Sequence, residues 1–147
     1  MKKIRIATII TLAISMLSLS LISCTGEVSF TTAKLSEVTM ASSVDESTYE
    51  PIEVTDTFEI DTPEIFLSAK FSNAPADTEI TAEWIYVEGE VEDMNNFVID
   101  TVAIEVSGTD YLYFSMPIPG ERWPRGQYKV DLYIDEDLDQ TATFTVQ

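Results

Sequence analysis

The sequence predicts an all-β sandwich in its C-terminal two thirds. From Phe58 onward, apolar residues recur at every second position, which is the period of a strand with one buried face. Turn-forming residues separate the alternating stretches, and none of them has the 3.6-residue period of an amphipathic helix. Sheets that each carry one apolar face stabilise each other by packing those faces together. We therefore expect an antiparallel sandwich of about seven strands within residues 57–147.

Seven segments share this period-two pattern. In residues 64–71 (EIFLSAKF), Ile65 and Leu67 fall on one face, and Ser68 and Lys70 fall on the other. Residues 73–77 (NAPAD) predict a turn, and Gly108 and residues 117–120 (PIPG) predict two further strand ends. The expected strands are residues 55–60, 64–71, 79–88, 96–107, 110–117, 127–135 and 141–147.

Two details of these strands resemble immunoglobulin-like domains. Trp84 lies in the middle of the third expected strand, where a core tryptophan is typical of that group. Tyr128 begins the sixth strand shortly after Gly126 and resembles a tyrosine corner, whose hydroxyl bonds a nearby backbone group. The bridging cysteines of antibody domains are absent, so the resemblance implies a cysteine-free variant. A jelly roll or a small barrel is the alternative.

The N-terminus has the layout of an export signal. Residues 1–5 are basic, residues 6–22 are uncharged and apolar, and the stretch ends at Ser23 and Cys24. This predicts a helical signal peptide over residues 1–23. Residues 21–24 (LISC) resemble the lipobox of prokaryotic lipoproteins. The resemblance implies cleavage between Ser23 and Cys24, a diacylglycerol on the Cys24 sulfur and palmitate-type acyl chains as the membrane anchor.

Two alternatives to the lipoprotein signal are an uncut signal anchor and an ordinary cleaved secretory peptide. The lipid-anchored chain would lie on the cell membrane or an outer membrane, with its domain facing away from the cytoplasm. Residues 24–56 are rich in Ser, Thr and acidic residues, which predicts a lipidated N-terminus followed by a flexible tether. Within the tether, residues 33–40 alternate weakly, and the sequence leaves open whether they form an edge strand.

Charge and composition exclude several functions. All 26 acidic residues follow position 24, together with only five of the eight basic ones, so the mature part has a net charge of −21 (5 − 26). Such a surface repels nucleic-acid phosphates, so we expect no nucleic-acid partner. The chain has no histidine and a single cysteine, which excludes a Cys/His zinc site and an intrachain disulfide.

Two acidic clusters suggest no chemistry beyond that of solvated turns. Asp135, Asp137 and Asp139 have the spacing of the first ligands in a calcium loop, but Gln140 replaces its glycine and Val146 its final glutamate. Residues 88–93 (EGEVED) contain paired carboxylates, yet such pairs are unavoidable among 26 acidic residues. With no histidine to act as a base, we expect neither an enzyme nor a bound metal or cofactor.

One loop offers a candidate partner contact. Arg122 and Arg125 flank Trp123, and an aromatic ring between two cations can anchor a partner. The alternative is that Trp123 covers the open end of the sandwich while the arginines pair with acids. Tyr113 and Tyr133 fall on expected outward faces, where tyrosines are more often sheet-surface pairs than ligand contacts.

The whole pattern resembles small prokaryotic lipoproteins with a C-terminal immunoglobulin-like domain. Their shared features are a lipobox, a Ser/Thr tether and a late W-P-x-G-x-Y-x-V-x-L-Y-x-D strand, which here is residues 123–135. The resemblance implies the fold and no particular activity. From the export signal and this fold we expect a non-catalytic binding module that contacts an envelope protein or glycan. The alternative is a structural spacer without a specific ligand.

Overall fold

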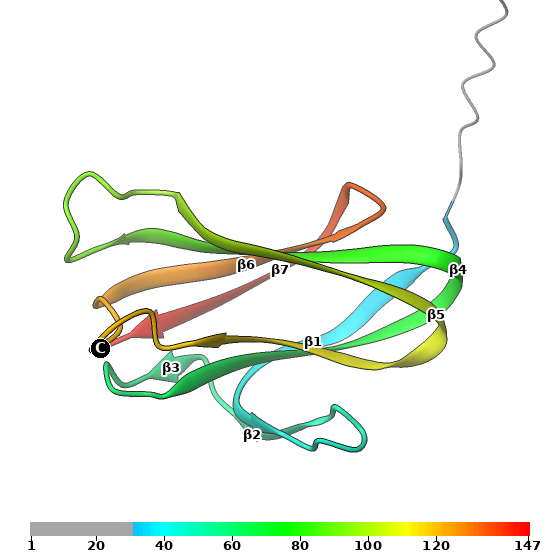
Figure 1. The fold of residues 1–147 in the computed structure, drawn as a ribbon, viewed down its shortest axis with the longest axis horizontal. Helices are drawn as coiled ribbons and strands as arrows, with labels where there is room; N and C mark the ends of the chain where they lie inside the picture. Colours follow the sequence, from blue (N-terminus) through cyan, green and yellow to red (C-terminus); the bar gives the residue numbers. More distant parts are fainter. Residues whose placement is uncertain (1–30) are drawn as a thin grey trace, which may run out of the picture.

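The computed structural model describes residues 31–147 and shows an all-β fold, as predicted (Figure 1). The predicted signal peptide over residues 1–23 and the lipidation site at Cys24 lie outside the described residues. Within residues 31–147 there is no helix with the length and hydropathy needed to cross a membrane. The strands are β1 (Lys34–Val44), β2 (Pro51–Val54), β3 (Thr57–Phe58), β4 (Glu64–Gly89), β5 (Phe97–Pro117), β6 (Gly126–Ile134) and β7 (Asp137–Val146).

The strands form one strongly curled sheet whose two halves pack face to face as a sandwich (Figure 1). The first half of β4 pairs with β1 and with the second half of β5, and β2 borders β1. The second half of β4 pairs with β6 and with the first half of β5. The β7 strand follows β6, and β3 closes that layer. The long strands β4 and β5 thus belong to both layers.

The predicted turn at residues 73–77 is a corner within β4. Asn73 and Asp77 both have positive φ, at 54° and 62°, and Gly108 of β5 has φ of 84°. Ala74 remains paired with Gly108, so the two strands bend together from one layer into the other. The turn and glycine signals therefore mark real departures from extended backbone. They do not end the strands, because the hydrogen-bonded ladder between β4 and β5 resumes on both sides.

The folded unit begins earlier than the sequence predicts. The range predicted as a tether, residues 24–56, contains β1 and β2. The open question about residues 33–40 is resolved as a strand, because residues 34–40 belong to β1 and pair with β4, whereas β2 pairs with residues 41–44. Leu35 and Met40 are both buried, although an odd spacing should place them on opposite faces. A bulge at Glu37, with φ of 52°, inserts one residue against β4 and returns both side chains to the core. The boundary predicted at residue 57 is therefore corrected to about residue 34.

The antiparallel arrangement predicted for the sheet holds for all the recorded strand pairs except one. The short β3 strand runs parallel to β7, with Thr57 opposite Thr145 and Phe58 opposite Val146. The longer strand expected over residues 55–60 is reduced to these two residues. The pairing places Phe58 against Phe144 in an edge-to-face contact with ring centroids 5.6 Å apart, so β3 contributes to the core despite its length.

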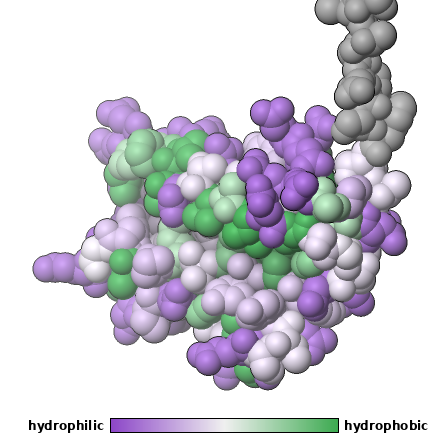
Figure 2. All heavy atoms as spheres, turned by 45° about the vertical axis from the view of Figure 1, so that its right-hand side comes forward, coloured by the Kyte–Doolittle hydropathy of each residue, from purple (hydrophilic) through white to green (hydrophobic). Residues whose placement is uncertain are grey.

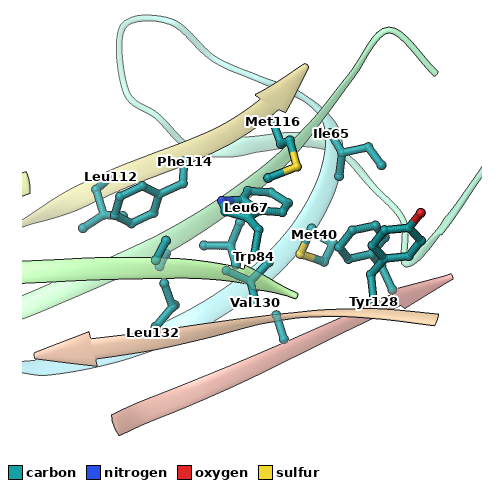
Figure 3. Close-up of a cluster of buried hydrophobic side chains, with 14 of the residues drawn as sticks. Met40, Ile65, Leu67, Trp84, Leu112, Phe114, Met116, Tyr128, Val130 and Leu132 are labelled. Carbon is teal, nitrogen blue, oxygen red and sulfur yellow. The ribbon is translucent and has the colours of Figure 1, made fainter. Parts of the chain in front are cut away.

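The core lies between the two layers and includes the predicted tryptophan. Trp84 is only 1% exposed. Figure 3 shows its ring amid side chains from both layers, with Phe114 and Met116 of β5 on one side and Val130 of β6 on the other. The Trp84 ring also contacts Phe144 edge-on at 6.1 Å. This confirms Trp84 as a core residue of the third expected strand.

The tyrosine corner is also confirmed. The Tyr128 hydroxyl donates a hydrogen bond of 2.6 Å to the carbonyl oxygen of Pro124, four residues upstream. Its ring stacks on Phe144 with centroids 4.9 Å apart, and burial raises the pKa of the phenol. Tyr128 therefore ties the segment that precedes β6 to the core.

Replacing Tyr128 with phenylalanine should lower the free energy of unfolding by about 1–3 kcal/mol, because the Pro124 carbonyl would lose its partner near the core. Urea denaturation of the purified chain measures this change. The matched control is Tyr133→Phe, which removes a weaker 3.3 Å bond to Glu83 and should cost less than about 0.5 kcal/mol. Equal losses from the two variants would contradict a structural role for the corner.

Candidate functional site

The predicted partner contact at Trp123 is corrected by the structure. Trp123 is 0% exposed, and its indole nitrogen donates a hydrogen bond of 2.8 Å to the Thr62 carbonyl oxygen. Its backbone N–H donates to the Ile60 carbonyl oxygen at 2.8 Å, which fixes the loop against the segment before β4. The ring meets Tyr128 edge-on at 5.9 Å. The indole is held inward by these contacts and is a core group.

Arg122 and Arg125 connect two loops at the same end of the sandwich. The Arg122 guanidinium pairs with the Glu90 carboxylate at 2.7 Å. The Glu90 N–H donates to the Arg125 carbonyl oxygen at 2.9 Å. A hydrogen bond from the Arg125 backbone, followed by the Arg122 guanidinium, lowers the pKa of Glu90. Residues 118–125 are therefore joined to residues 90–96 by the Arg122 side chain and the Arg125 backbone. The alternative of an arginine paired with an acid holds for Arg122.

Two glycines allow these loops to approach closely. Gly89 at the end of β4 pairs with Gly126 at the start of β6. A Cβ on Gly89 would overlap the Arg125 carbonyl oxygen, and a Cβ on Gly126 would overlap the Glu88 carbonyl oxygen. Tyr86 lies against the glycine pair, and its hydroxyl donates to the Arg125 carbonyl oxygen at 3.2 Å. The hydroxyl also accepts the N–H of Val91 at 3.1 Å, so Tyr86 positions the loop after β4.

An apolar pocket lies between the two loops and the start of β5. Its volume is about 210 Å³, and its lining surface is wholly apolar. A pocket of this size is below the range typical of drug-sized ligands and suits a single apolar side chain. Phe97 at its rim is 48% exposed, which is unusual for a phenylalanine. The lining residues are Tyr86, Val91, Met94, Phe97, Ile99, Pro119, Pro124 and Tyr128.

The pocket was not predicted from the sequence, although one signal of it was present. Residues 97–99 (FVI) are three consecutive apolar residues and interrupt the period of two. In the structure, Asp100 pairs with Trp84 while Val98 pairs with the next residue, Ile85. Ile99 is therefore an extra, bulged residue whose side chain is released from the ladder and lines the pocket. The break in alternation at residues 97–99 therefore corresponds to a β-bulge at Ile99.

The acidic residues after β6 form a hairpin tip. Asp135 and Glu136 have φ of 48° and 77°, as in a two-residue turn of type I′. The Asp135 carboxylate accepts the N–H of Glu79 at 2.9 Å, and the Asp139 carboxylate accepts the N–H of Leu35 at 3.2 Å. The Asp135 carboxylate therefore bonds β4, and the Asp139 carboxylate bonds β1. Among residues 31–147, no group of three metal-ligating side chains is close enough to hold an ion.

The outward tyrosines occupy different surroundings. Tyr113 of β5 is 39% exposed and lies against Tyr49 and Phe66, with ring centroids 5.3 and 6.1 Å away. Tyr133 of β6 is half-buried and donates to Glu83, and partial burial followed by the Glu83 charge raises the pKa of its phenol. Both therefore have neighbours on their own sheet faces, as expected for surface pairs.

Comparison with solved structures shows what this architecture resembles. An immunoglobulin-like protein from Pseudomonas aeruginosa is 14% identical, and the match covers 78% of this chain and 96% of that one with a TM-score of 0.55. An alkylpurine DNA glycosylase from Pseudomonas fluorescens, solved with DNA containing an abasic-site analogue, is 11% identical with a TM-score of 0.51. That match covers 78% of this chain and only 30% of the glycosylase.

Sequence comparison adds no relative, since no protein-family description and no curated protein matches the chain. At identities of 11% and 14%, the structural likenesses bear on the fold alone. Together with the two packed layers, the core tryptophan and the tyrosine corner, they show that this chain folds as an immunoglobulin-like β-sandwich.

Proposed function

We propose that the chain is a lipid-anchored envelope protein that displays its acidic sandwich as a non-catalytic binding module. The observation that carries this proposal is the apolar pocket beside the half-exposed Phe97. Exposed apolar surface is unfavourable in water, and a partner that covers it would gain the corresponding hydrophobic free energy. The pocket is preformed, because hydrogen bonds of Tyr86 and an ion pair of Arg122 hold the two loops that build it.

The anchor is supported by the lipobox and by the position of the first strand. Cys24 is the single cysteine of the chain and falls at the processing position of the LISC sequence. Because β1 begins at Lys34, the nine residues 25–33 separate the proposed lipid from the sandwich. A segment of nine residues spans at most about 30 Å. The domain would therefore remain near the membrane surface and meet partners within the envelope.

The chemistry of the pocket favours binding over catalysis. Its titratable groups are Tyr86 and Tyr128, and both hydroxyls donate to backbone carbonyl oxygens. Both hydroxyls are therefore engaged within the protein and are not directed at a ligand. The likeness to the glycosylase covers a minor part of that protein, and 26 acidic residues against eight basic ones oppose the approach of DNA phosphates. A protein side chain is the ligand that the pocket suits best.

Crosslinking in intact envelopes tests this function. The full chain and its Phe97→Ala variant would be crosslinked, purified and compared by mass spectrometry, with Tyr113→Ala as the matched loss of an exposed aromatic elsewhere. We expect the parent chain and Tyr113→Ala to retain the same partner protein, and Phe97→Ala to lose most of it. Recovery of lipid alone from all three chains would refute the binding role and favour the structural spacer.

A further inference from the structure

The β5 strand forms an edge of both layers. Within residues 31–147 it pairs only with β4, so one side of its 21-residue backbone has no partner strand. Natural edge strands are usually short, covered, or protected by charged residues. Here the backbone N–H groups of Thr101 and Tyr111 donate to the preceding carboxylates, Asp100 and Asp110, at 2.9 and 2.8 Å. The edge is therefore protected locally and is open along the rest of its length.

The two sides of the first half of β5 differ in chemistry. Ile104 and Val102 pair with the buried Ile80 and Ala82 and so point toward the core side. They are only partly covered, and Val102 is 37% exposed. Figure 2 shows hydrophobic residues exposed on the surface of the molecule among hydrophilic ones. An added strand would bury this apolar side.

The opposite side of the same strand contains a pair of like charges. Glu105 pairs directly with Glu79 of β4, although like charges at directly opposed positions repel each other. Neither residue belongs to the ion pairs recorded within residues 31–147. Of the three exposed acidic residues of β5, Asp100 pairs with the buried Trp84 and Asp110 pairs with the buried Phe71, so Glu105 is the one that lies on this opposite side. A cation placed beside Glu105 would relieve the repulsion.

We propose that β5 binds an extended segment of a partner protein in which apolar and basic residues alternate, by adding that segment as a strand along residues 97–106. This inference rests on the proposed binding function and names its partner chemistry. Strand side chains alternate between faces, so such a segment would place apolar groups beside Val102 and Ile104 and Lys or Arg beside Glu105. The pocket at Phe97 lies at the start of the same stretch and would receive a terminal apolar anchor.

A second copy of this chain is a poorer occupant of the edge. An antiparallel pairing of two β5 strands that sets Glu105 against its counterpart would also set Asp100 against Asp110. Like charges directly opposite each other destabilise a strand pair. In addition, the formal charge of the chain is −18, so association of two copies joins strongly negative surfaces. Charge complementarity thus favours a basic partner.

The test uses the full chain in detergent and a capped eight-residue peptide of alternating valine and lysine. We expect saturable binding that weakens with added salt, and slower hydrogen exchange of backbone amides confined to residues 97–106. Two control peptides separate the contributions. A valine–glutamate peptide should not bind, and a valine–lysine peptide N-methylated at alternate residues, which lacks half of its backbone donors, should lose most of its affinity.

Two variants of the chain complete the experiment. Glu105→Lys should weaken binding of the valine–lysine peptide by about five- to tenfold, because a cross-strand attraction becomes a repulsion. Glu59→Lys makes the same charge change at an exposed site beside β3 and should bind within about twofold of the parent chain. Equal affinity for the N-methylated peptide, or exchange protection elsewhere, would overturn strand addition. If the envelope partner is nevertheless retained and depends on Phe97, the proposed binding function survives that failure.

Discussion

Replacing Trp123 with alanine is expected to lower the free energy of unfolding by about 3–5 kcal/mol, the range measured for removing a buried tryptophan. The indole is fully buried, packs edge-on against Tyr128 and donates a hydrogen bond to the Thr62 carbonyl oxygen. Its removal leaves a cavity at the end of the sandwich and an unpaired carbonyl group. A loss of this size is a large fraction of the stability of a small domain.

Urea denaturation followed by circular dichroism measures the change, with Phe97→Ala as the control. Phe97 lies at the rim of the same end of the sandwich but is 48% exposed, so its loss should cost less than about 1 kcal/mol. The two variants should therefore differ in what they change: Trp123→Ala lowers the free energy of unfolding, and Phe97→Ala lowers partner capture. An unchanged denaturation midpoint for Trp123→Ala would place the indole outside the core.

Replacing Cys24 with alanine should abolish lipidation and processing and leave a larger precursor. The reason is chemical, because the thiolate of Cys24 is the nucleophile that would accept the diacylglycerol, and alanine has no equivalent group. Intact-mass analysis of the exported chain, with detergent partitioning, measures the outcome. Thr25→Ala is the matched control, since it alters the neighbouring residue without removing the thiol. Normal cleavage before residue 24 in the Cys24→Ala variant would show that the chain is not a lipoprotein.

Most of the strand content could be predicted because alternation is a local property of the sequence. The pattern in residues 127–135 places Tyr128, Val130 and Leu132 on one face, and all three are buried. Bends and bulges were not predictable in this way. The segments 64–71 and 79–88 look like separate strands, yet both belong to β4, because pairing with β5 resumes beyond the corner at Ala74. The pattern in β1 was hidden by the bulge at Glu37.

The candidate site depended even more on contacts between distant segments. Residues 122–125 correctly marked a loop at the open end of the sandwich, but the sequence could not decide which aromatic ring faces outward. A backbone hydrogen bond to Ile60 and an indole hydrogen bond to Thr62, both about 60 residues upstream, hold Trp123 inward. The exposed aromatic at this end is Phe97, at the start of the strand with the free edge.

By itself, the sequence determined the all-β class, the acidic surface and the expectation of a lipid anchor at Cys24, because periodicity, charge and a signal with its cysteine are all contained in short stretches of chain. Only the tertiary structure decided that β1 joins the core, that β5 has an open edge and that a pocket lies beside Phe97. Each of these depends on which strands pair across long separations and on bulges that move side chains from one face to the other. Strand pairing and bulge positions are determined by packing across the whole domain, so the sequence of a single segment does not predict them.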